Sequence, residues 1–326
     1  MKSIAKVLTA AAVAALAGGT LVAGTQAGAQ TQAQATRPAP AQKPILAWAS
    51  KPDPDLPYDD INRLVWRLSD ILAMHKGQTD WSQTVVNNRD VIAQWISLGP
   101  GHKTKTVFYA DDRVYWVVQS GAMKVTIEGQ EPFIATKHFL VQVPKRLQYS
   151  IETVGKEPSL RFEVRPSGEP PQYPVSETPT PVPGFKYIEA VYTGHGDYDK
   201  VNRPYIDFEK QIVQGGEKIG VWIRDDHTYV TILRSQKGVP TPPDNVWGHF
   251  HANFPEFWLV IEGTQQFLVE GEKLLTVGDG DLVAAPTGRW HRAMPYGEGP
   301  STRLAFIPRP DNLHWYQPEQ AGAGGN

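Results

Sequence analysis

The chain has 326 residues, of which 40% are hydrophobic and 10% aromatic, so most of it can form a packed core instead of remaining disordered. Its 32 basic and 34 acidic side chains nearly balance and no run of basic residues stands out, which excludes a nucleic-acid-binding protein. The sequence contains no cysteine, which excludes disulfides, thiolate metal ligands and a cysteine nucleophile.

The N-terminal residues have the pattern of a secretory signal peptide. Lys2 and Lys6 precede an apolar stretch, and Ala27–Ala29 fits the small-residue cleavage pattern. Two glycines interrupt the apolar stretch and no stop-transfer charges follow it, which argues against a membrane anchor. We therefore expect residues 1–29 to be removed, and the mature protein to be periplasmic or secreted with no membrane partner.

The rest of the chain divides by composition. Residues 30–45, rich in Gln, Ala and Pro, predict a flexible tether, and the Gly- and Ala-rich residues 311–326 predict a tail. Residues 46–165 and 186–310 are rich in short β-type runs, and the Pro-rich residues 166–185 form a linker between them. The composition thus predicts an all-β chain with two domains.

One segment shows helical periodicity. From Asp59 to about His75, apolar residues recur at helical spacing, which predicts a helix that covers a sheet. We expect this helix to help the two domains pack together or form a homodimer, because such sheets expose edges that need covering.

The two β-rich regions are related by duplication. Residues 114–149 align with residues 256–291 at a constant offset of 142, and eight of the 36 positions are identical. The matches include Gly121 with Gly263, at a position where a hairpin turn is needed.

The second region carries a candidate metal site. His249 and His251 lie two residues apart, so on a strand both imidazoles point to one face. Residues 252–255 can turn the chain, which lets Glu256 begin a neighbouring strand, and His291 comes from a later one. Three imidazoles and one carboxylate suit Fe, Mn, Co, Ni, Cu or Zn and leave coordination positions open. We expect one divalent transition metal ion per chain.

These residues meet two motifs, and through them the chain resembles a two-domain cupin, or bicupin. The first motif is H-x-H, four residues, Glu, six residues and Gly, and the second is Gly, five residues, P-x-G, two residues and His. They are met by His249, His251, Glu256 and Gly263, and by Gly280, Pro286, Gly288 and His291. The resemblance implies a jelly-roll β-barrel in each half and metal ligation by the three histidines and Glu256. Pro243 and Pro295 stand where the family often has Gly and Asn, and neither is a ligand position.

The first copy lacks ligand-type residues at the aligned positions. The residues there are Val107, Tyr109, Val114 and Tyr149. We therefore expect residues 46–165 to form a degenerate barrel without a metal site, which supports packing or dimerisation. Five of the remaining histidines, His102, His138, His195, His227 and His314, are expected to face solvent or be satisfied in the core.

Candidate pocket residues follow from strand parity. Trp258 and Val260 share the parity of Glu256, and together with the aromatic side chain of Phe250 they are expected to line a substrate pocket. The sequence does not fix the orientation of four further candidates, Arg224, Gln265, Gln266 and Arg303.

Two residues are candidates for a catalytic role. Glu256 could move protons if it is partly released from the metal. Arg289 shares the parity of His291 and could bind a substrate carboxylate, the alternative being a surface ion pair.

The functional expectation is an exported metal-dependent enzyme that acts on a small organic molecule. Oxygenase chemistry on a phenolic, enolic or carboxylate compound is favoured by the aromatic surroundings and by the resemblance. The alternatives are a metal-dependent lyase or isomerase, and a non-catalytic protein that binds a sugar acid or another carboxylate.

Overall fold

The computed structural model describes residues 50–51, 53, 57–181, 183–184, 186–238, 248–308 and 314–316. The predicted signal peptide and tether lie outside the described residues, as do most of the predicted tail and the segment 239–247. None of the helices in the described part is long and apolar enough to cross a membrane.

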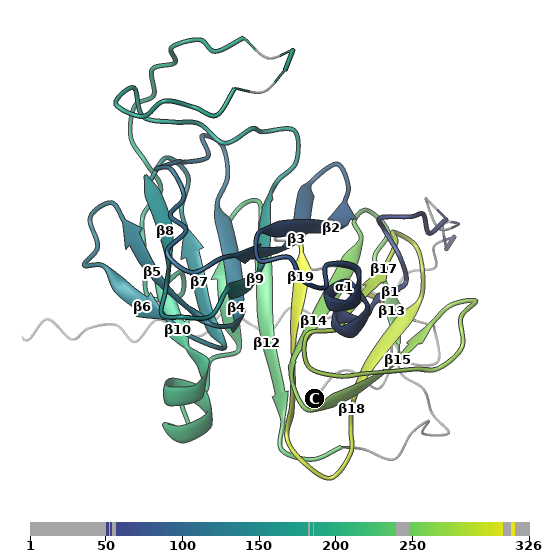
Figure 1. The fold of residues 1–326 in the computed structure, drawn as a ribbon. Coiled ribbons are helices and arrows are strands. Elements are labelled where there is room, and N and C mark those ends of the chain that lie inside the picture. Colours follow the sequence, from purple (N-terminus) through teal and green to yellow (C-terminus); the bar gives the residue numbers. More distant parts are fainter. Residues whose placement is uncertain are drawn as a thin grey trace, which may run out of the picture. The chain divides into compact units, whose positions relative to one another are not determined.

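The first barrel consists of two antiparallel sheets (Figure 1). Its strands are β2 (Trp81–Asn87), β3 (Val91–Leu98), β4 (Val114–Ser120), β5 (Ala122–Ile127), β6 (Phe133–Ala135), β7 (Phe139–Val143), β8 (Tyr149–Val154), β9 (Ser159–Pro166) and β10 (Tyr205–Asp207). Within the described chain, the strand order is β10-β7-β4-β9-β3-β2 in one sheet and β6-β5-β8 in the other.

The second barrel repeats this arrangement. Its strands are β1 (Val65–Trp66), β11 (Val221–Arg224), β12 (Tyr229–Ser235), β13 (His249–Phe250), β14 (Glu256–Glu262), β15 (Thr264–Val269), β16 (Leu275–Val277), β17 (Leu282–Ala285), β18 (His291–Tyr296), β19 (Ser301–Ile307) and β20 (Trp315–Tyr316). The described strands are ordered β1-β17-β14-β19-β12-β11 and β16-β15-β18-β13-β20. The all-β prediction with two jelly-roll barrels is confirmed.

Strand register confirms the predicted duplication. Trp116 pairs with Val141 in the first barrel, and Trp258 pairs with Val283 in the second, so both partners shift by the same 142 residues. The turn after β4 and the turn after β14 also correspond, because Gly121 and Gly263 have φ angles of 73° and 67°. A side chain at Gly263 would also meet the backbone of Pro300, so glycine is required there.

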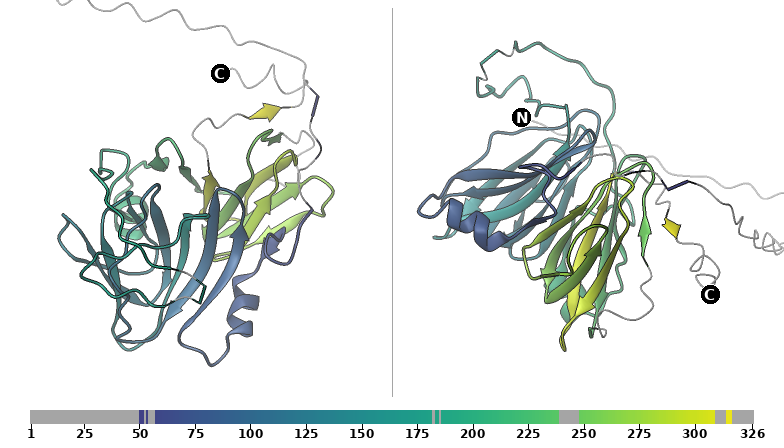
Figure 2. Two further views of the ribbon diagram at one scale, coloured as in Figure 1. Left: turned by 90° about the horizontal axis from the view of Figure 1, so that it is seen from above. Right: turned by 90° about the vertical axis from the view of Figure 1, so that its right-hand side faces the viewer.

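The two barrels exchange edge strands. β1 precedes the first barrel in sequence but pairs with β17 of the second barrel. β10 follows the linker but pairs with β7 of the first barrel. Each exchanged strand leads into a short helix, α1 (Leu68–Met74) after β1 and the π-helix η1 (Phe208–Gln214) after β10. Two further views show the barrels side by side (Figure 2).

A hexapeptide repeat, Tyr-Asp-x-Ile/Val-Asn-Arg, precedes each exchanged strand, at residues 58–63 and 198–203. The tyrosine hydroxyl of each copy donates a 2.9 Å hydrogen bond to the strand with which the exchanged strand pairs. Tyr58 donates to the Ala284 carbonyl of β17, and Tyr198 donates to the Gln142 carbonyl of β7. These two acceptors also differ by 142 residues, so the duplication extends to the contacts between the barrels.

The asparagine of each copy binds the other barrel. Asn62 donates to the Asn87 carbonyl and accepts from its N–H at the end of β2, at 3.0 and 2.8 Å. Asn202 does the same with Arg224 at the end of β11, at 3.0 and 2.9 Å. Each copy of the hexapeptide repeat therefore bonds to both barrels.

The predicted helix over residues 59–75 is wrong for its first half. The Asp59 carboxylate accepts hydrogen bonds from the N–H groups two and three residues later, at 2.7 and 2.6 Å, which turns the chain. Residues 65–66 then pair with β17, so the helix α1 begins only at Leu68. The apolar residues at helical spacing therefore lie in a turn, then in a strand, and only then in a helix.

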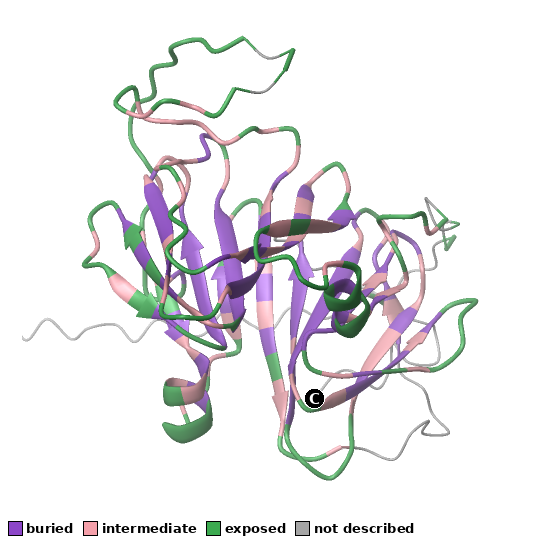
Figure 3. Cartoon of the chain, in the orientation of Figure 1, coloured by how far each residue is buried: buried purple, intermediate pink, exposed green. Residues whose placement is uncertain are grey.

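An aromatic cluster joins the two barrels. Phe306 of β19 lies 4.8 Å from Phe257 in the same barrel, and 5.7 Å and 6.1 Å from Phe162 and Tyr115 of the first barrel, measured between ring centroids. These side chains belong to one hydrophobic core that contains residues of both barrels. Buried residues accordingly follow the central strands, whereas the described residues from 175 to 201 are mostly exposed (Figure 3).

An ion pair adds to this interface. Lys137 and Asp279 occupy equivalent positions in the two copies, and their Nζ and Oδ2 atoms lie 2.8 Å apart. Burial raises the pKa of Asp279, but hydrogen bonds from His138, Lys137 and Gln119 outweigh it and lower the pKa to about 2.

We expect Asp279→Asn to lower the free energy of unfolding at pH 7 by about 1–2 kcal/mol, after allowance for partial solvent exposure. Because the folded-state pKa lies below the ordinary value, the contribution of Asp279 is fully present above pH 4 and is lost as the pH falls towards 2. Denaturant titration at pH 7 and at several values below pH 4 would measure this. A stability difference that does not shrink in acid would contradict it.

Candidate metal centre

Three strands and one loop bring the four predicted ligands together. His249 lies on β13, and His251 follows it in the loop that leads to β14. Glu256 begins β14 and His291 begins β18, which pairs with His249 across the sheet. The Gly288 N–H donates to the His251 carbonyl at 2.7 Å, which joins the two sequence motifs through their backbones.

The ligand atoms converge on one carboxylate oxygen. Oε2 of Glu256 lies 2.8 Å from His251 Nε2, 3.2 Å from His291 Nε2 and 3.9 Å from His249 Nε2. Nε2 of His291 and of His249 lie 3.3 Å apart. All four ligand atoms are within 4.8 Å of one another. The predicted convergence of these residues on a single point is therefore present.

Burial and hydrogen bonding prepare these groups for ligation. His251, Glu256 and His291 are almost fully buried. His291 Nδ1 lies 2.9 Å from the Arg289 carbonyl and donates its proton there, which leaves the Nε2 lone pair for a metal. Burial lowers the pKa of His249 and raises that of Glu256, but the three imidazoles around Glu256 hold its pKa well below the ordinary value.

The donor set fits a divalent transition metal. Metal–nitrogen and metal–oxygen bonds of about 2.0–2.2 Å place neighbouring ligand atoms roughly 3–4 Å apart, as they are here. Neutral imidazoles with one carboxylate bind Fe, Mn, Co, Ni, Cu or Zn, and four protein ligands leave one or two positions open.

The open side of the centre faces a cavity of about 310 Å³. Three ligands, His249, Glu256 and His291, line it, and Trp258 lies 4.9 Å from the His291 ring. The other lining residues are Thr231, Leu233, Arg292, Ala293, Arg303, Ala305, Ile307 and His314. The cavity is thus large enough for a small organic molecule and has cationic as well as apolar walls.

His314 is an unexpected member of this group. Strand β20 pairs with β13 and brings the His314 ring to 4.1 Å from the His249 ring. Burial, followed by the neighbouring imidazoles, lowers the His314 pKa to about 4, so the ring is neutral at pH 7. No sequence spacing indicated this position, because His314 is more than twenty residues from the other ligands and reaches them only through strand pairing.

Not every predicted pocket residue reaches the cavity. Trp258 lines it, whereas Val260 is fully buried in the barrel core and Phe250 stacks on Trp315 at 6.1 Å. Arg289 lies outside the cavity, where its guanidinium covers the Tyr58 ring at 4.7 Å.

The guanidinium of Arg289 also lies 3.6 Å from Glu272. It resides in the turn before β18, so strand parity does not apply to it. This placement favours the surface ion pair over a role in substrate binding.

The aligned positions of the first barrel hold a packed core. Val107, Tyr109, Val114 and Tyr149 all belong to one hydrophobic cluster, in which Tyr149 stacks on Trp116. Two of the other histidines, His102 and His138, lie next to carboxylates, Asp80 and Glu209, at 2.7 and 2.5 Å. His195 and His227 are exposed.

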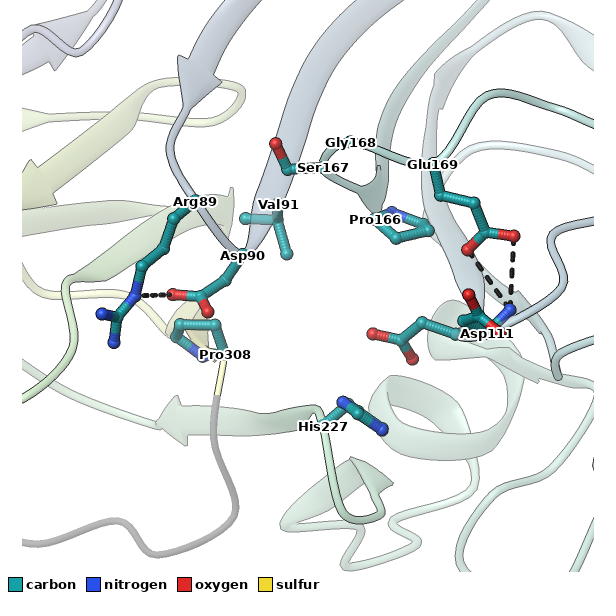
Figure 4. A pocket seen from close by; sticks show the side chains of 11 residues that line it. Arg89, Asp90, Val91, Asp111, Pro166, Ser167, Gly168, Glu169, His227 and Pro308 are labelled. Atoms are coloured by element: carbon teal, nitrogen blue, oxygen red, sulfur yellow. Dashed lines mark hydrogen bonds and ion pairs between the residues drawn. The ribbon is translucent and has the colours of Figure 1, made fainter.

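A larger cavity, of about 380 Å³, lies away from the metal ligands (Figure 4). Its walls include Asp90, Asp111, Glu169 and His227. The carboxylate of Glu169 accepts from the Asp111 N–H, and Asp90 pairs with Arg89, as the dashed lines show. These side chains already have partners within the chain, so we place the chemistry at the metal ligands.

Comparison with known proteins supports the fold. No family model and no curated protein sequence matches the chain. Among solved structures, a salicylate 1,2-dioxygenase from Pseudaminobacter salicylatoxidans superposes with a TM-score of 0.54 at 13% identity, over 75% of this chain and 83% of that one. A mutant of this enzyme in complex with gentisate gives 0.54 at 13% identity, over 78% and 84%.

A cupin 2 conserved barrel domain protein from Leptotrichia buccalis gives a TM-score of 0.49 at 13% identity, over 75% of this chain and 96% of that one. The two barrels, the two sequence motifs and the converged ligands all agree with a cupin fold. The chain therefore has the fold of a two-domain cupin, with a candidate metal centre in its second barrel.

Proposed function

We propose that the protein is a metal-dependent enzyme that acts on a small organic molecule, with oxygenation of a phenolic, enolic or carboxylate compound as its chemistry. The observation that carries the proposal is the convergence of His249, His251, Glu256 and His291 at the wall of a cavity. The fold likeness to a salicylate 1,2-dioxygenase makes oxygenase chemistry a candidate for this centre.

The residues of the chain would bind the metal ion and keep water away from the substrate. A redox-active ion held by the four ligands would supply Lewis acidity and electron exchange with dioxygen. Trp258 and Ile307, which are both buried at the cavity wall, would exclude water from an organic substrate. Glu256 is held as a carboxylate by its three imidazole neighbours, and it would accept a proton only on partial release from the metal.

Oxygen consumption by the reconstituted protein tests the proposal. We expect forms loaded with Fe, Mn or Cu to consume dioxygen with chelating phenols, enols or hydroxy acids, and the Zn form to be inactive because Zn has no accessible redox change. Equal turnover by the Zn form, or turnover without oxygen, would replace this proposal with a lyase or isomerase. Absence of turnover with any metal, together with tight binding of sugar acids, would replace it with a binding protein.

We also propose export, on the strength of the N-terminal sequence pattern alone. N-terminal sequencing of the mature protein is expected to begin near Gln30. A retained Met1 would overturn the proposal.

A further inference from the structure

The cavity contains an arginine without a carboxylate partner in the described part of the chain. Arg303 lies on β19, and the residues with the same strand parity, Ala305 and Ile307, line the cavity beside it. Its guanidinium donates a hydrogen bond from Nη1 to Oε1 of Gln265 at 3.2 Å, and its Nε is buried without a partner among the described residues. No carboxylate of the described residues forms an ion pair with this side chain, and the carboxylate that acts on its charge from across the cavity is that of Glu256, one of the candidate metal ligands.

In the first barrel, the arginine at the position equivalent to Arg303 has a carboxylate partner. Arg161 is the equivalent of Arg303, since it pairs with Val118 as Arg303 pairs with Val260. Nε of Arg161 lies 2.7 Å from Oε2 of Glu163, and both side chains are buried.

The position equivalent to Glu163 in the second barrel is Ala305. The barrel that has lost the metal ligands thus carries an internal carboxylate for this arginine. The barrel that has the ligands lacks that carboxylate.

We propose that Arg303 binds the carboxylate group of the substrate, while a second oxygen of the same molecule occupies an open position on the metal. The proposal rests on the proposed metal centre and specifies its substrate class as a small carboxylate with a neighbouring oxygen, such as a 2-hydroxy or 2-oxo acid. The missing partner of Arg303 is then the substrate itself.

Two features support this role. Gln265 holds the guanidinium in place, because its amide nitrogen donates to Ser301 Oγ at 2.7 Å while its oxygen accepts from Arg303. Both Gln265 and Ser301 are almost completely buried. Burial lowers the Arg303 pKa only to about 10, so the side chain remains cationic at pH 7.

An anion in the cavity would also relieve an electrostatic imbalance. A divalent ion bound by one carboxylate keeps positive charge, and Arg303 adds to it in a partly desolvated space. A carboxylate offers a guanidinium two parallel hydrogen bonds, whereas a neutral amide or phenol does not.

Exchange of one residue between the barrels tests the proposal. Ala305→Glu gives the second barrel the carboxylate of the first, and Ala305→Gln adds nearly the same volume without charge. We expect the Mn(II)-loaded full-length protein to bind salicylate at least about 10-fold more tightly than salicylamide. We expect Ala305→Glu to remove this preference and Ala305→Gln to retain it.

Arg303→Gln is expected to weaken salicylate binding about 10- to 100-fold and to leave salicylamide binding nearly unchanged. Isothermal titration gives the affinities. Metal analysis, with the Mn(II) electron paramagnetic resonance spectrum, verifies that each variant is folded and loaded. Equal weakening by Ala305→Glu and Ala305→Gln, or an intact salicylate preference in Arg303→Gln, would overturn the role of Arg303.

Binding and turnover separate this inference from the proposed function. An Arg303-dependent preference for carboxylates without any turnover supports the carboxylate site and overturns the enzymatic proposal. Turnover of neutral chelators without any preference for carboxylates overturns the carboxylate site and leaves the enzyme in place.

Discussion

Replacement of His251 by alanine is expected to lower metal affinity by at least about 100-fold. His251 is buried, and its Nε2 lies closest of the three imidazoles to the Glu256 carboxylate. Loss of a group that merely orients a metal ligand already costs about 10–100-fold in affinity, so loss of a ligand costs at least as much. Metal content after equilibrium dialysis against a buffered metal ion would measure the effect.

The first barrel offers a matched control for this variant. Tyr149 occupies the position equivalent to His291, but it belongs to an apolar cluster and stacks on Trp116. Tyr149→Phe is therefore expected to leave metal content unchanged, at one ion per chain. Two ions per wild-type chain, or equal metal loss in the two variants, would contradict the assignment of the centre to the second barrel.

Phe306→Ala is expected to lower the free energy of unfolding by about 3–5 kcal/mol. The ring is 1% exposed and contacts aromatic side chains of both barrels, Phe162 and Tyr115 on one side and Phe257 on the other. Removal of the ring leaves a cavity that neither barrel can close alone. Denaturant unfolding followed by tryptophan fluorescence would measure the loss.

Because the cluster is shared, we also expect both barrels to unfold in one transition. Ile134→Ala is a suitable control, since Ile134 is 49% exposed at the edge of the first barrel and should change stability by only about 0.5 kcal/mol. Two separate transitions in the wild-type protein, or a Phe306→Ala effect as small as that of the control, would show that the barrels do not share a core.

Three metal ligands, His249, His251 and Glu256, could be predicted from local geometry, and His291 could be predicted through the spacing of the second motif. Two histidines separated by one residue share a face of a strand, and the four residues between His251 and Glu256 suffice for a turn. The strand register of the duplication could be predicted for the same reason, since turn glycines such as Gly263 fix where each hairpin begins.

The features that depend on distant pairing could not be predicted. His314 reaches the centre through the pairing of β20 with β13, and Arg303 faces the cavity because of its register with β14. The hexapeptide repeat at residues 58–63 and 198–203 is visible in the sequence, but its function in holding the two barrels together requires knowledge of which strands it meets. Strand parity gave a wrong orientation for Arg289 because that residue lies in a turn and not in a strand.

We expect a single metal ion to bind between His249, His251, Glu256 and His291. Anomalous diffraction from crystals of the Mn(II)- or Co(II)-loaded protein tests it most directly. We expect one strong anomalous peak per chain, about 2.0–2.2 Å from the Nε2 atoms of the three histidines and from the Glu256 carboxylate. A peak in the acidic cavity lined by Asp111 and Glu169, or no peak near the three histidines, would contradict it.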